Sequence, residues 1–422
     1  MKKKQLLTSA ILVSSLMLGA CGKNTESTTT IEPTSENQNN NSNEANAEAP
    51  TSLQASFDNL FVNTLNSTED KNDNVLLSPY SLVMDFGMLE NGTSGDGLDE
   101  MVTSLNGGTS VDDLNTLMQD SKKKMMESND VTWNIANSIW LNENNISDIN
   151  PEIKEIVKKY YSSEINKRPY SNETLKEINN WVNDNTNGMI PSLLDEIHSD
   201  DVMHLINAVA FEGDWDIKFN AHSIMKNQEF TNLDGSTAEV DMLHGDVDEY
   251  FTNDDLEGFT KAFADNNYEF FAIKPKGDLT PAELMKKFKN DNETISSIMS
   301  KYTVNENANI KVPKFKVDYG MNLNAMLQNM GIKKIFTGEA DFSKLADTDS
   351  LMVSKVIQKT HFELSETGVK AAAATSIAMT KSAMRRNVEE KFEIILDKPF
   401  IYGIYDKNTS LPIFIGSMNT MK

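Results

Sequence analysis

Hydrophobic residues recur at helical spacing in several parts of the chain. Residues 52–65 have one apolar side, made of Leu53, Phe57, Leu60, Phe61 and Leu65. Residues 80–89 are apolar almost throughout, which predicts a buried helix. Residues 178–185 and 190–197 predict two short helices around a break at Gly188.

Other stretches alternate between apolar and polar residues, or are apolar for only a few positions, and these predict strands. They cover residues 75–77, 202–211, 270–274, 310–317, 352–357, 392–396, 400–405 and 412–417. The cluster Asp406-Lys407-Asn408 predicts a hairpin turn between the last two. No internal repeat and no long interior linker divides these elements, so the pattern predicts one large α+β domain.

One segment, residues 364–381, fits two structures: LSETGVKAAAATSIAMTK. From Val369 onward its residues alternate, with Val, Ala, Ala, Thr, Ile and Met on the side that carries no charge. Alanine is a poor strand former, and the four consecutive alanines favour a helix instead. The pattern alone therefore leaves a helix and a conditional strand open.

The first residues resemble an exported bacterial lipoprotein. Three lysines, a short apolar run and small residues before Cys21 predict a signal peptide over residues 1–20. Leu18-Gly19-Ala20-Cys21 resembles a lipoprotein cleavage box, which implies that Cys21 is acylated and anchors the chain firmly to a membrane. The alternative is an ordinary signal peptide with a cysteine beside it. Cys21 is the only cysteine, so no internal disulfide is possible.

Residues 21–51 have almost nothing to bury and predict a disordered tether, with the folded domain following over residues 52–422. A coil of this length spans about 30 Å. The formal net charge is −24, which argues against nucleic acid as a partner and against adhesion to anionic lipid headgroups.

Motifs of enzyme chemistry are absent from the sequence. It has no nucleophile elbow, phosphate loop, zinc-binding helix or paired-cysteine motif. The five histidines are scattered, and the acidic stretch around Asp246 and Asp254 lacks the glycine and the final glutamate of a calcium loop. The chain is therefore expected to be neither an enzyme nor a binder of metals or cofactors.

A series of ordered motifs resembles the serpin family. Residues 366–375 are similar to the hinge of the serpin reactive-centre loop, and Ile394 to Tyr402 to the family signature. Further matches lie at Asn74–Ser81 with Gly92-Thr93, Ile178–Val182 with Thr186–Gly188, Asn207-Ala208 with Phe211–Trp215 and Phe219, Lys311–Phe315, and Pro412–Gly416. Together they span the predicted domain in the family's order.

The resemblance implies a serpin fold with three β-sheets, eight or nine helices and an exposed reactive-centre loop. It also implies a monomer that inhibits serine, and also cysteine, endopeptidases as a suicide substrate. The cleaved loop inserts into the main sheet and traps the acyl-enzyme. With the predicted anchor, such a protein is expected at the outer membrane or cell surface. The alternative is a non-inhibitory serpin that acts as a surface carrier or scaffold.

The hinge residues implied by the resemblance suit insertion between strands, because they are small and include no proline. They are Glu366, Gly368, Val369, Lys370, Ala371, Ala372, Ala373, Ala374 and Thr375. Counting seventeen residues from Glu366 places the cleaved bond at Ser382-Ala383, and a loop one residue shorter places it at Lys381-Ser382. A lysine before the bond suits trypsin-like proteases, whereas serine suits elastase- or subtilisin-like ones.

The resemblance also implies two control regions. Ser78, Ser81 and Asn207 match polar positions of the shutter beneath the main sheet, and Trp215 lies in the breach motif. The fourth shutter position, usually histidine in the family, is Gln358 here. Since glutamine both donates and accepts hydrogen bonds, we expect an altered network whose effect on sheet opening the sequence does not give.

Overall fold

The computed structural model describes residues 52–68, 70–128, 130–348, 351–369 and 391–422. This part of the chain contains nine α-helices, in agreement with the eight or nine expected. They are α1 Leu53–Ser67, α2 Pro79–Asn91, α3 Gly95–Leu105, α4 Val111–Glu127, α5 Pro151–Ile156, α6 Asn172–Asn185, α7 Pro281–Asn290, α8 Ile295–Lys301 and α9 Asn324–Asn329. Short helical turns cover Val157–Tyr161, Ala221–Ser223 and Lys334–Phe336.

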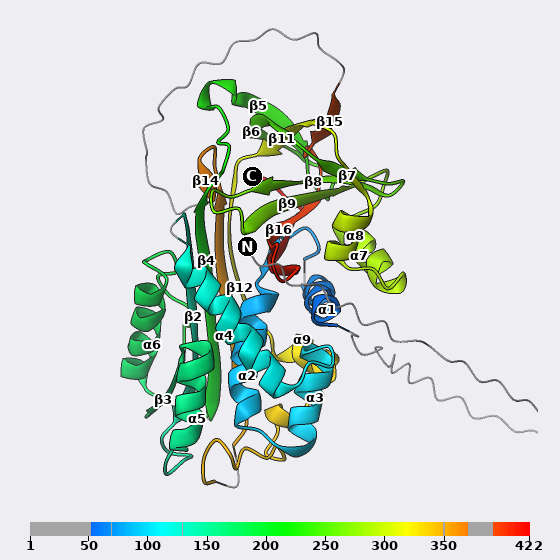
Figure 1. Ribbon diagram of the computed structural model, residues 1–422. Coiled ribbons are helices and arrows are strands. Elements are labelled where there is room, and N and C mark those ends of the chain that lie inside the picture. The colour runs from blue at the N-terminus through cyan, green and yellow to red at the C-terminus, as the bar shows by residue number, and fades with distance from the viewer. Residues whose placement is uncertain (1–51, 69, 129, 349–350, 370–390) are drawn as a thin grey trace, which may run out of the picture. The chain divides into compact units, whose positions relative to one another are not determined.

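Three sheets are formed by the described residues, so the predicted α+β class with three sheets is confirmed (Figure 1). The six-stranded sheet has the order β12 Phe315–Asn322, β13 Lys355–Leu364, β14 Gly368–Val369, β4 Met203–Asp214, β2 Val131–Asn142 and β3 Glu164–Arg168. The seven-stranded sheet runs β1 Val75–Leu77, β17 Leu411–Met418, β16 Phe400–Asp406, β9 Tyr268–Pro275, β8 Leu256–Ala262, β7 Tyr250–Thr252 and β10 Thr303–Val304. The four-stranded sheet runs β15 Phe392–Ile395, β11 Ala308–Pro313, β6 Thr237–Val247 and β5 Met225–Thr231.

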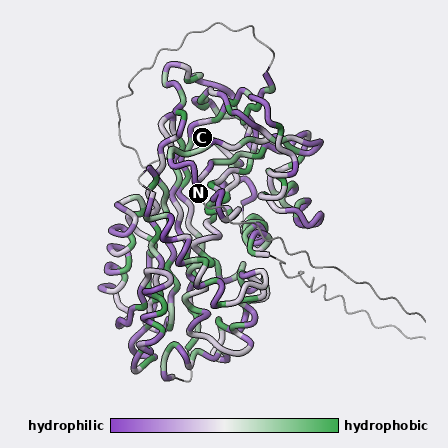
Figure 2. Tube along the Cα trace, viewed as in Figure 1, coloured by the Kyte–Doolittle hydropathy of each residue, from purple (hydrophilic) through white to green (hydrophobic). Residues whose placement is uncertain are grey.

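The six-stranded sheet is covered on both faces. Helix α2 lies on one face and α6 on the other (Figure 1). Along β4, Leu205 and Val209 belong to the main hydrophobic core on the α2 side, whereas Ile206 and Ala208 belong to a smaller core with α6. This alternation explains why β4 reads as a continuous apolar run in the sequence. Figure 2 shows hydrophobic residues, in green, along the strands inside the molecule.

Helix α2 is buried along its whole length, and its start follows from local sequence. Ser78 is the N-cap, since its side chain accepts a hydrogen bond from the Ser81 amide, and Pro79 occupies the first helical turn. Tyr80, Leu82 and Phe86 are at most 1% exposed. A helix that is apolar on every side needs packing partners all round, and α2 finds them in β2, β4 and β17.

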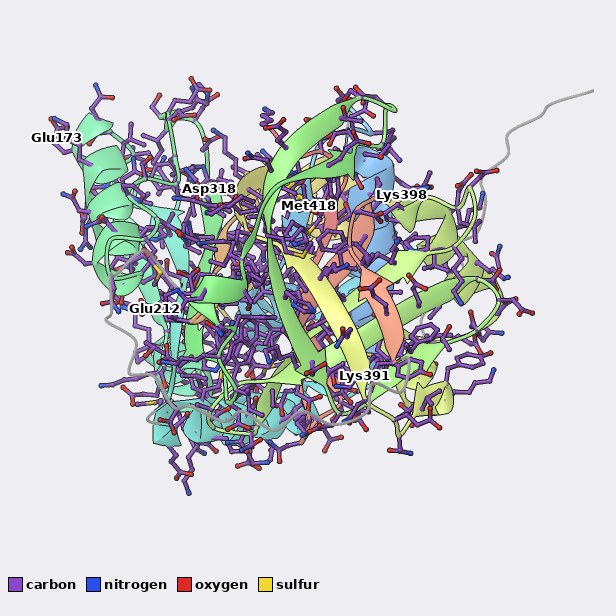
Figure 3. The ribbon with its side chains drawn as sticks, turned by 90° about the horizontal axis from the view of Figure 1, so that it is seen from above. Glu173, Glu212, Asp318, Lys391, Lys398 and Met418 are labelled. Carbon is purple, nitrogen blue, oxygen red and sulfur yellow. The ribbon has the colours of Figure 1, made fainter. Side chains whose placement is uncertain are left out.

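The view in Figure 3 shows how α6 is placed against the rest of the domain. Glu173, in the first turn of α6, lies at the left margin of this view, whereas Lys398, which precedes β16, lies right of its centre. Helix α6 therefore covers the outer face of the six-stranded sheet, away from the strands that follow residue 391.

Among the described residues, no helix is both long enough and apolar enough to cross a bilayer.

Most of the expected elements are present, but three expectations are wrong. Residues 190–197 form no helix, because the amides of Leu193 and Leu194 donate to the side chain of Asn179 instead of to a helical turn. Residues 310–317 are not one strand: Pro313 ends β11, and β12 begins at Phe315 in another sheet. The strand expected at 352–357 begins only at Lys355.

Candidate functional site: the seam of the six-stranded sheet

The two central long strands of the six-stranded sheet meet along a parallel seam. Strands β13 and β4 pair in parallel from Lys355 opposite His204 to His361 opposite Ala210. Above His361 the two strands separate, and β14 lies between them. A parallel pair inside a sheet is held by evenly spaced, slanted hydrogen bonds and is slightly less stable per residue than an antiparallel pair.

Strand β14 contains the predicted hinge residues Gly368 and Val369 and is antiparallel to both neighbours. Gly368 lies opposite Asp214 and Val369 opposite Gly213 on β4, while Val369 also lies opposite Leu364 on β13. The Val369 side chain is 1% exposed and joins the main core. Gly368 and Val369, where the alternation begins, therefore already occupy the sheet as a strand.

Gly368 is needed for this placement because the backbones approach closely. A Cβ atom at Gly368 would collide with the carbonyl oxygen of Gly213 and lie 2.8 Å from the Cα atom of Asp214. Both obstacles are backbone atoms of β4, so a side-chain rotation cannot relieve them. Only glycine fits between β13 and β4 at this position.

Trp215 and Phe219 hold the turn that leads into β14. The Trp215 indole donates to the carbonyl oxygen of Ser365 at 2.9 Å, and its backbone amide donates to that of Thr367 at 2.9 Å. The amide of Phe219 donates to the carbonyl oxygen of Glu366 at 3.0 Å. Three successive carbonyl groups of the hinge are thus fixed by the segment that follows β4.

Glu366 is tied by its side chain as well. Lys314 Nζ lies 2.7 Å from Glu366 Oε2, and this interaction lowers the pKa of Glu366 below its ordinary value although partial burial opposes the shift. Lys314 stands between β11 and β12, so the ion pair connects the hinge to the junction of two sheets.

The four predicted shutter residues lie together beneath the seam, in one buried hydrogen-bond network. Gln358 Oε1 accepts from the Ser78 amide at 2.9 Å, and Gln358 Nε2 donates to the carbonyl oxygen of Ser78 at 2.9 Å. The same Nε2 donates to Asn207 Oδ1 at 2.7 Å, and Asn207 Nδ2 donates to Ser81 Oγ at 2.8 Å. The amide at position 358 therefore bridges the start of α2 and strand β4.

Asn137 of β2 completes this network and was not predicted. Its Oδ1 accepts from Ser81 Oγ at 2.9 Å and from Asn207 Nδ2 at 2.9 Å, and its Nδ2 donates to the Ser81 carbonyl oxygen at 3.0 Å. Sequence reasoning predicted no strand over the residues of β2, so nothing singled out Asn137. Its register opposite Asn207 becomes visible only when β2 and β4 are paired.

A carboxylic acid, Asp85 of α2, is buried beside the network and was also missed. Its side chain is 0% exposed. Burial raises the pKa of Asp85 well above its ordinary value, and the neighbouring Asn207 offsets part of that shift. Among the described residues, no hydrogen bond of normal geometry reaches either oxygen of this group. An ionised Asp85 would be costly here, so the site favours the neutral acid.

Other predicted site residues fall outside the described part of the chain. They are the hinge residues Lys370, Ala371, Ala372, Ala373, Ala374 and Thr375, the bond residues Lys381, Ser382 and Ala383, and the lipidation residue Cys21. The predicted breach residue Trp215 and the hinge residues Glu366, Gly368 and Val369 are brought together as described above.

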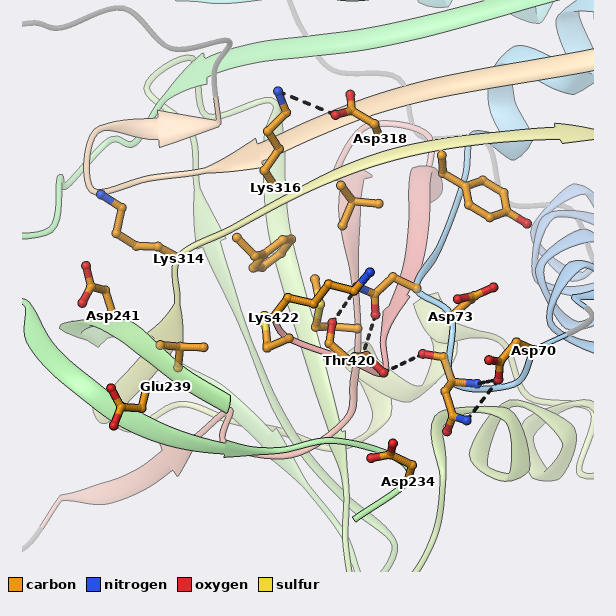
Figure 4. A pocket seen from close by; sticks show the side chains of 18 of the residues that line it. Asp70, Asp73, Asp234, Glu239, Asp241, Lys314, Lys316, Asp318, Thr420 and Lys422 are labelled. Atoms are coloured by element: carbon orange, nitrogen blue, oxygen red, sulfur yellow. Dashed lines mark hydrogen bonds and ion pairs between the residues drawn. The ribbon is translucent and has the colours of Figure 1, made fainter. Parts of the chain in front are cut away.

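A separate open groove of about 1110 Å³ lies beside β12 (Figure 4). Its charged lining residues are Asp70, Asp73, Asp234, Glu239, Asp241, Asp318, Lys314, Lys316 and Lys422. Lys316 Nζ lies 3.6 Å from Asp318 Oδ2, so part of this charge is paired. Within the described ranges, no group of three or more histidine, cysteine or acidic residues could hold a metal ion.

Comparison with known proteins gives one consistent result. Residues 53–421 match the family described as serpin (serine protease inhibitor). The chain is 29% identical to Iripin-1 of Ixodes ricinus over 380 residues, which cover 85% of this chain and 92% of that protein. It is 27% identical to human neuroserpin, covering 84% of this chain and 87% of that protein.

Solved structures agree with this. The thermophilic serpin tengpin in its native state is 32% identical, with a TM-score of 0.79 over 87% of this chain and 93% of that chain. Tengpin in its latent state gives a TM-score of 0.73, covering 88% of this chain and 98% of that chain. Serpins are protease inhibitors and not catalysts, as expected above for this chain. The family match over nearly the whole described domain, together with these relatives, shows that the chain belongs to the serpin family.

Proposed function

We propose that this protein is a suicide-substrate inhibitor of serine endopeptidases, and also of cysteine endopeptidases. A protease cleaves the reactive-centre loop, and the cleaved loop inserts between β13 and β4 before the acyl bond is hydrolysed. One observation carries the proposal: β14 already pairs with β4 through Gly368 and Val369 and with β13 through Val369, at the open end of the seam. Insertion is then the extension of an existing strand.

The sheet register supports insertion without any sliding of the strands. Each step forward from Val369 is one step back along β4 and along β13, because both pairings are antiparallel. On this register residue 378 falls opposite both His204 and Lys355, which already face each other across the seam. Residue 381 falls opposite Asp201. The strands need only move apart.

The side-chain pattern of the loop fits the two covers of the sheet. Val369 points into the main core, so every second residue after it would do the same: Ala371, Ala373, Thr375, Ile377 and Met379. The other set would face α6, where the small core already includes Ala136 and Ala208. Between Val369 and Lys381, Lys370 is the only charged residue.

Insertion would also be favourable for the backbone. One parallel pairing between β13 and β4 would be replaced by two antiparallel pairings with the new strand. The small residues of the segment contribute little burial each, so a large part of the gain is in the ladder hydrogen bonds and in the closed seam.

The scissile bond is proposed within residues 379–386. Counting from Glu366 favours Ser382-Ala383, and Lys381-Ser382 is the candidate bond for trypsin-like proteases. The target is accordingly a trypsin-like, elastase-like or subtilisin-like enzyme. The loop also contains Arg385 and Arg386, which offer further cleavage positions.

The test is a panel of purified trypsin, elastase and subtilisin incubated with the full-length protein. A complex that survives denaturing electrophoresis, with the released peptide identified by mass spectrometry, is the expected result. Val369→Arg is the matched variant, because a charged side chain at this buried position blocks insertion and leaves only cleaved protein. Simple cleavage of the wild type by every protease would refute the inhibitory function.

The second candidate is a non-inhibitory serpin that serves as a surface carrier or scaffold. Solved structures of thyroxine-binding globulin are at most 22% identical to this chain, and this similarity concerns the fold alone. The hinge sequence does not favour this candidate, since it lacks the bulky or proline-containing residues that would stop insertion.

We further propose that the protein is exported and anchored through lipid on Cys21, at the outer membrane or cell surface, with residues 22–51 as the tether. The support is the sequence pattern described above. Growth with radiolabelled palmitate should label the wild type. Labelling that persists in Cys21→Ala would refute the proposal.

A further inference from the structure

The lower end of the seam is held by two side-chain contacts in addition to a backbone hydrogen bond. The Val202 amide donates to Ser354 Oγ at 2.7 Å, and the Ser354 amide donates to the Met203 carbonyl oxygen at 2.8 Å. Lys355 Nζ lies 3.5 Å from Asp201 Oδ2. All three contacts cross from the β4 side to the β13 side. We call this group the foot clasp; its members are Asp201, Val202, Met203, His204, Ser354 and Lys355.

The β4 side of the foot clasp is fixed by its neighbours. His204 Nε2 lies 2.9 Å from Asp201 Oδ2, and the His204 ring is 0% exposed. Burial lowers the pKa of His204 to about 4, with the hydrogen bond to Asp201 offsetting part of the shift, so the ring is neutral near pH 7 and donates to the carboxylate. Asn142 of β2 donates to the Asp201 carbonyl oxygen at 2.9 Å.

The β13 side is fixed in the same way. Asn324, at the start of α9, donates through Nδ2 to the Ser354 carbonyl oxygen at 2.7 Å and accepts from the Val356 amide at 2.9 Å. Each half of the foot clasp is thus bound to its own part of the molecule, one through β2 and the other through α9. The contacts between the halves break when the seam opens to its full length.

We propose that the foot clasp is the last contact to open during insertion, and that it decides how completely the cleaved segment inserts. This inference rests on the proposed inhibitory function. A new strand moves its neighbours apart by about 4.8 Å, which separates Lys355 from Asp201 and Ser354 from Val202. The ladder above is different, because each broken backbone hydrogen bond is replaced by one to the new strand.

The foot clasp would therefore affect whether the acyl-enzyme is trapped by insertion or hydrolysed. Once the loop is cleaved, insertion competes with hydrolysis of the acyl bond. A tighter foot clasp delays the final part of insertion and increases the fraction of inhibitor that is consumed as substrate. The residues act on the position of the inserted strand and not on the first attack of the protease, so they are positioning residues.

Two synthetic peptides test the inference on the uncleaved full-length protein. A short peptide with the sequence of residues 370–376 ends opposite Ile206 on the seam register, above the foot clasp. A long peptide with the sequence of residues 370–382 extends past Asp201. Lys355→Met should take up the long peptide about three- to fivefold faster than the wild type and the short peptide at the wild-type rate.

The matched control is Lys316→Met, which removes a lysine of the same sheet from an ion pair outside the seam. It should take up both peptides at the wild-type rate. The second variant is Ser354→Ala, which removes the acceptor of the Val202 amide and is a smaller change. Like Lys355→Met, it should take up the long peptide faster than the wild type. With the protease identified in the panel, both variants should lower the inhibitor-to-protease ratio needed for full inhibition, with an unchanged rate of initial acylation.

The outcomes separate this inference from the proposed function. Suppose that the wild type takes up both peptides, and that Lys355→Met and Ser354→Ala take up the long peptide at the wild-type rate. The role of the foot clasp is then refuted, whereas inhibition by insertion is not. A faster uptake of the short peptide by these variants would also refute that role, because that indicates general loosening. If the wild type accepts neither peptide and forms no stable protease complex, the proposed function itself fails.

Discussion

At the scale of single residues, two positions stand out at the seam. Gly368 has no side chain, and Asp85 has a buried carboxylic acid that is neutral. Gly368 lets β14 approach the Gly213 carbonyl group closely enough to pair, and the next residue fills the core with an apolar side chain. Asp85 places a neutral acid beneath the same strands. Both residues contact β4, Gly368 through its backbone pairing and Asp85 through its neighbour Asn207.

Gly368→Ala should expel β14 from the sheet, because the added methyl group collides with backbone atoms of β4. We expect the native state to lose about 0.5–3 kcal/mol. Hydrogen exchange followed by mass spectrometry should show lost protection in peptides that cover residues 211–215 and 366–369. Gly97→Ala is the control, since a Cβ atom there meets only ordinary contacts of 3.5 Å or more. Unchanged protection in Gly368→Ala would contradict the steric argument.

Asp85→Asn should stabilise the native state increasingly as pH rises. The pKa of Asp85 is raised in the folded protein, so its stabilising contribution is complete below the unfolded pKa of about 3.9 and is lost as pH rises toward the folded value. The difference between variant and wild type should therefore grow by up to about 1.4 kcal/mol per pH unit across that window.

The measurement is the midpoint of the first urea transition between pH 5 and pH 8. Burial also raises the pKa values of Asp58 and Glu90 to about 7, so only the difference between Asp85→Asn and the wild type isolates Asp85. Exposed Asp120→Asn serves as the control and should shift the midpoint equally little at every pH. A pH-independent effect of Asp85→Asn would show that the buried group does not titrate as argued.

At the scale of elements, α6 and β4 show how the seam is covered. Ile178 and Val182 of α6 are fully buried against the outer face of the sheet, in a core separate from the main one. An inserted strand would lie in the same sheet, so α6 must allow the strands to separate while its own apolar face stays covered. The small residues expected on the outer face of the new strand meet this requirement.

Ile178→Ala should lower the stability of the native state by about 2–5 kcal/mol, because it leaves a cavity between α6 and the sheet. It should also speed the uptake of the short and the long peptide alike, since the cover extends along the seam. Lys176→Ala, on the exposed side of the same helix, is the control and should change neither quantity. Selective acceleration of the long peptide would assign the effect to the foot clasp instead.

At the scale of the whole molecule, β14 lies between β13 and β4 at one end of the seam, and the two long strands pair directly along the rest of it. The hinge contacts with Trp215 lie at the upper end, the network around Gln358 in the middle, and the foot clasp at the lower end. Each joins the β13 half to the β4 half or to the helix beneath them. Full insertion would leave the hinge contacts in place and would open the Gln358 network and then the foot clasp.

Cleavage of the loop within residues 379–386 should raise the melting temperature by about 5 °C or more, because an inserted strand adds several kcal/mol and each kcal/mol shifts a domain of this size by about 1–2 °C. Differential scanning calorimetry of the intact and cleaved protein makes the measurement. Val369→Arg, cleaved at the same bond, should show no such rise. An equal melting temperature of the intact and cleaved wild type would mean that the loop stays outside the sheet.

Sequence reasoning reached those parts of the fold and site that depend on near neighbours in the chain. The apolar spacing that gives α1 and α2 could be read from the residues, whereas Ser78, Ser81, Asn207 and Gln358 were named through the resemblance to the serpin family. Asn137 could not be singled out, because β2 was not predicted and its register against β4 joins distant parts of the chain. Residues 190–197 were misread, since the side chain that binds their amides lies on a preceding helix.

The sequence by itself determined the class of the fold, the family motifs and the alternating pattern that begins at Val369, because local periodicity and residue size are properties of neighbouring positions. The tertiary structure alone decided the register of β13 against β4, the seating of β14 at Gly213 and Asp214, the buried state of Asp85 and the contact of Asp201 with Lys355. These depend on residues about 150 positions apart, whose meeting follows from the packing of whole sheets.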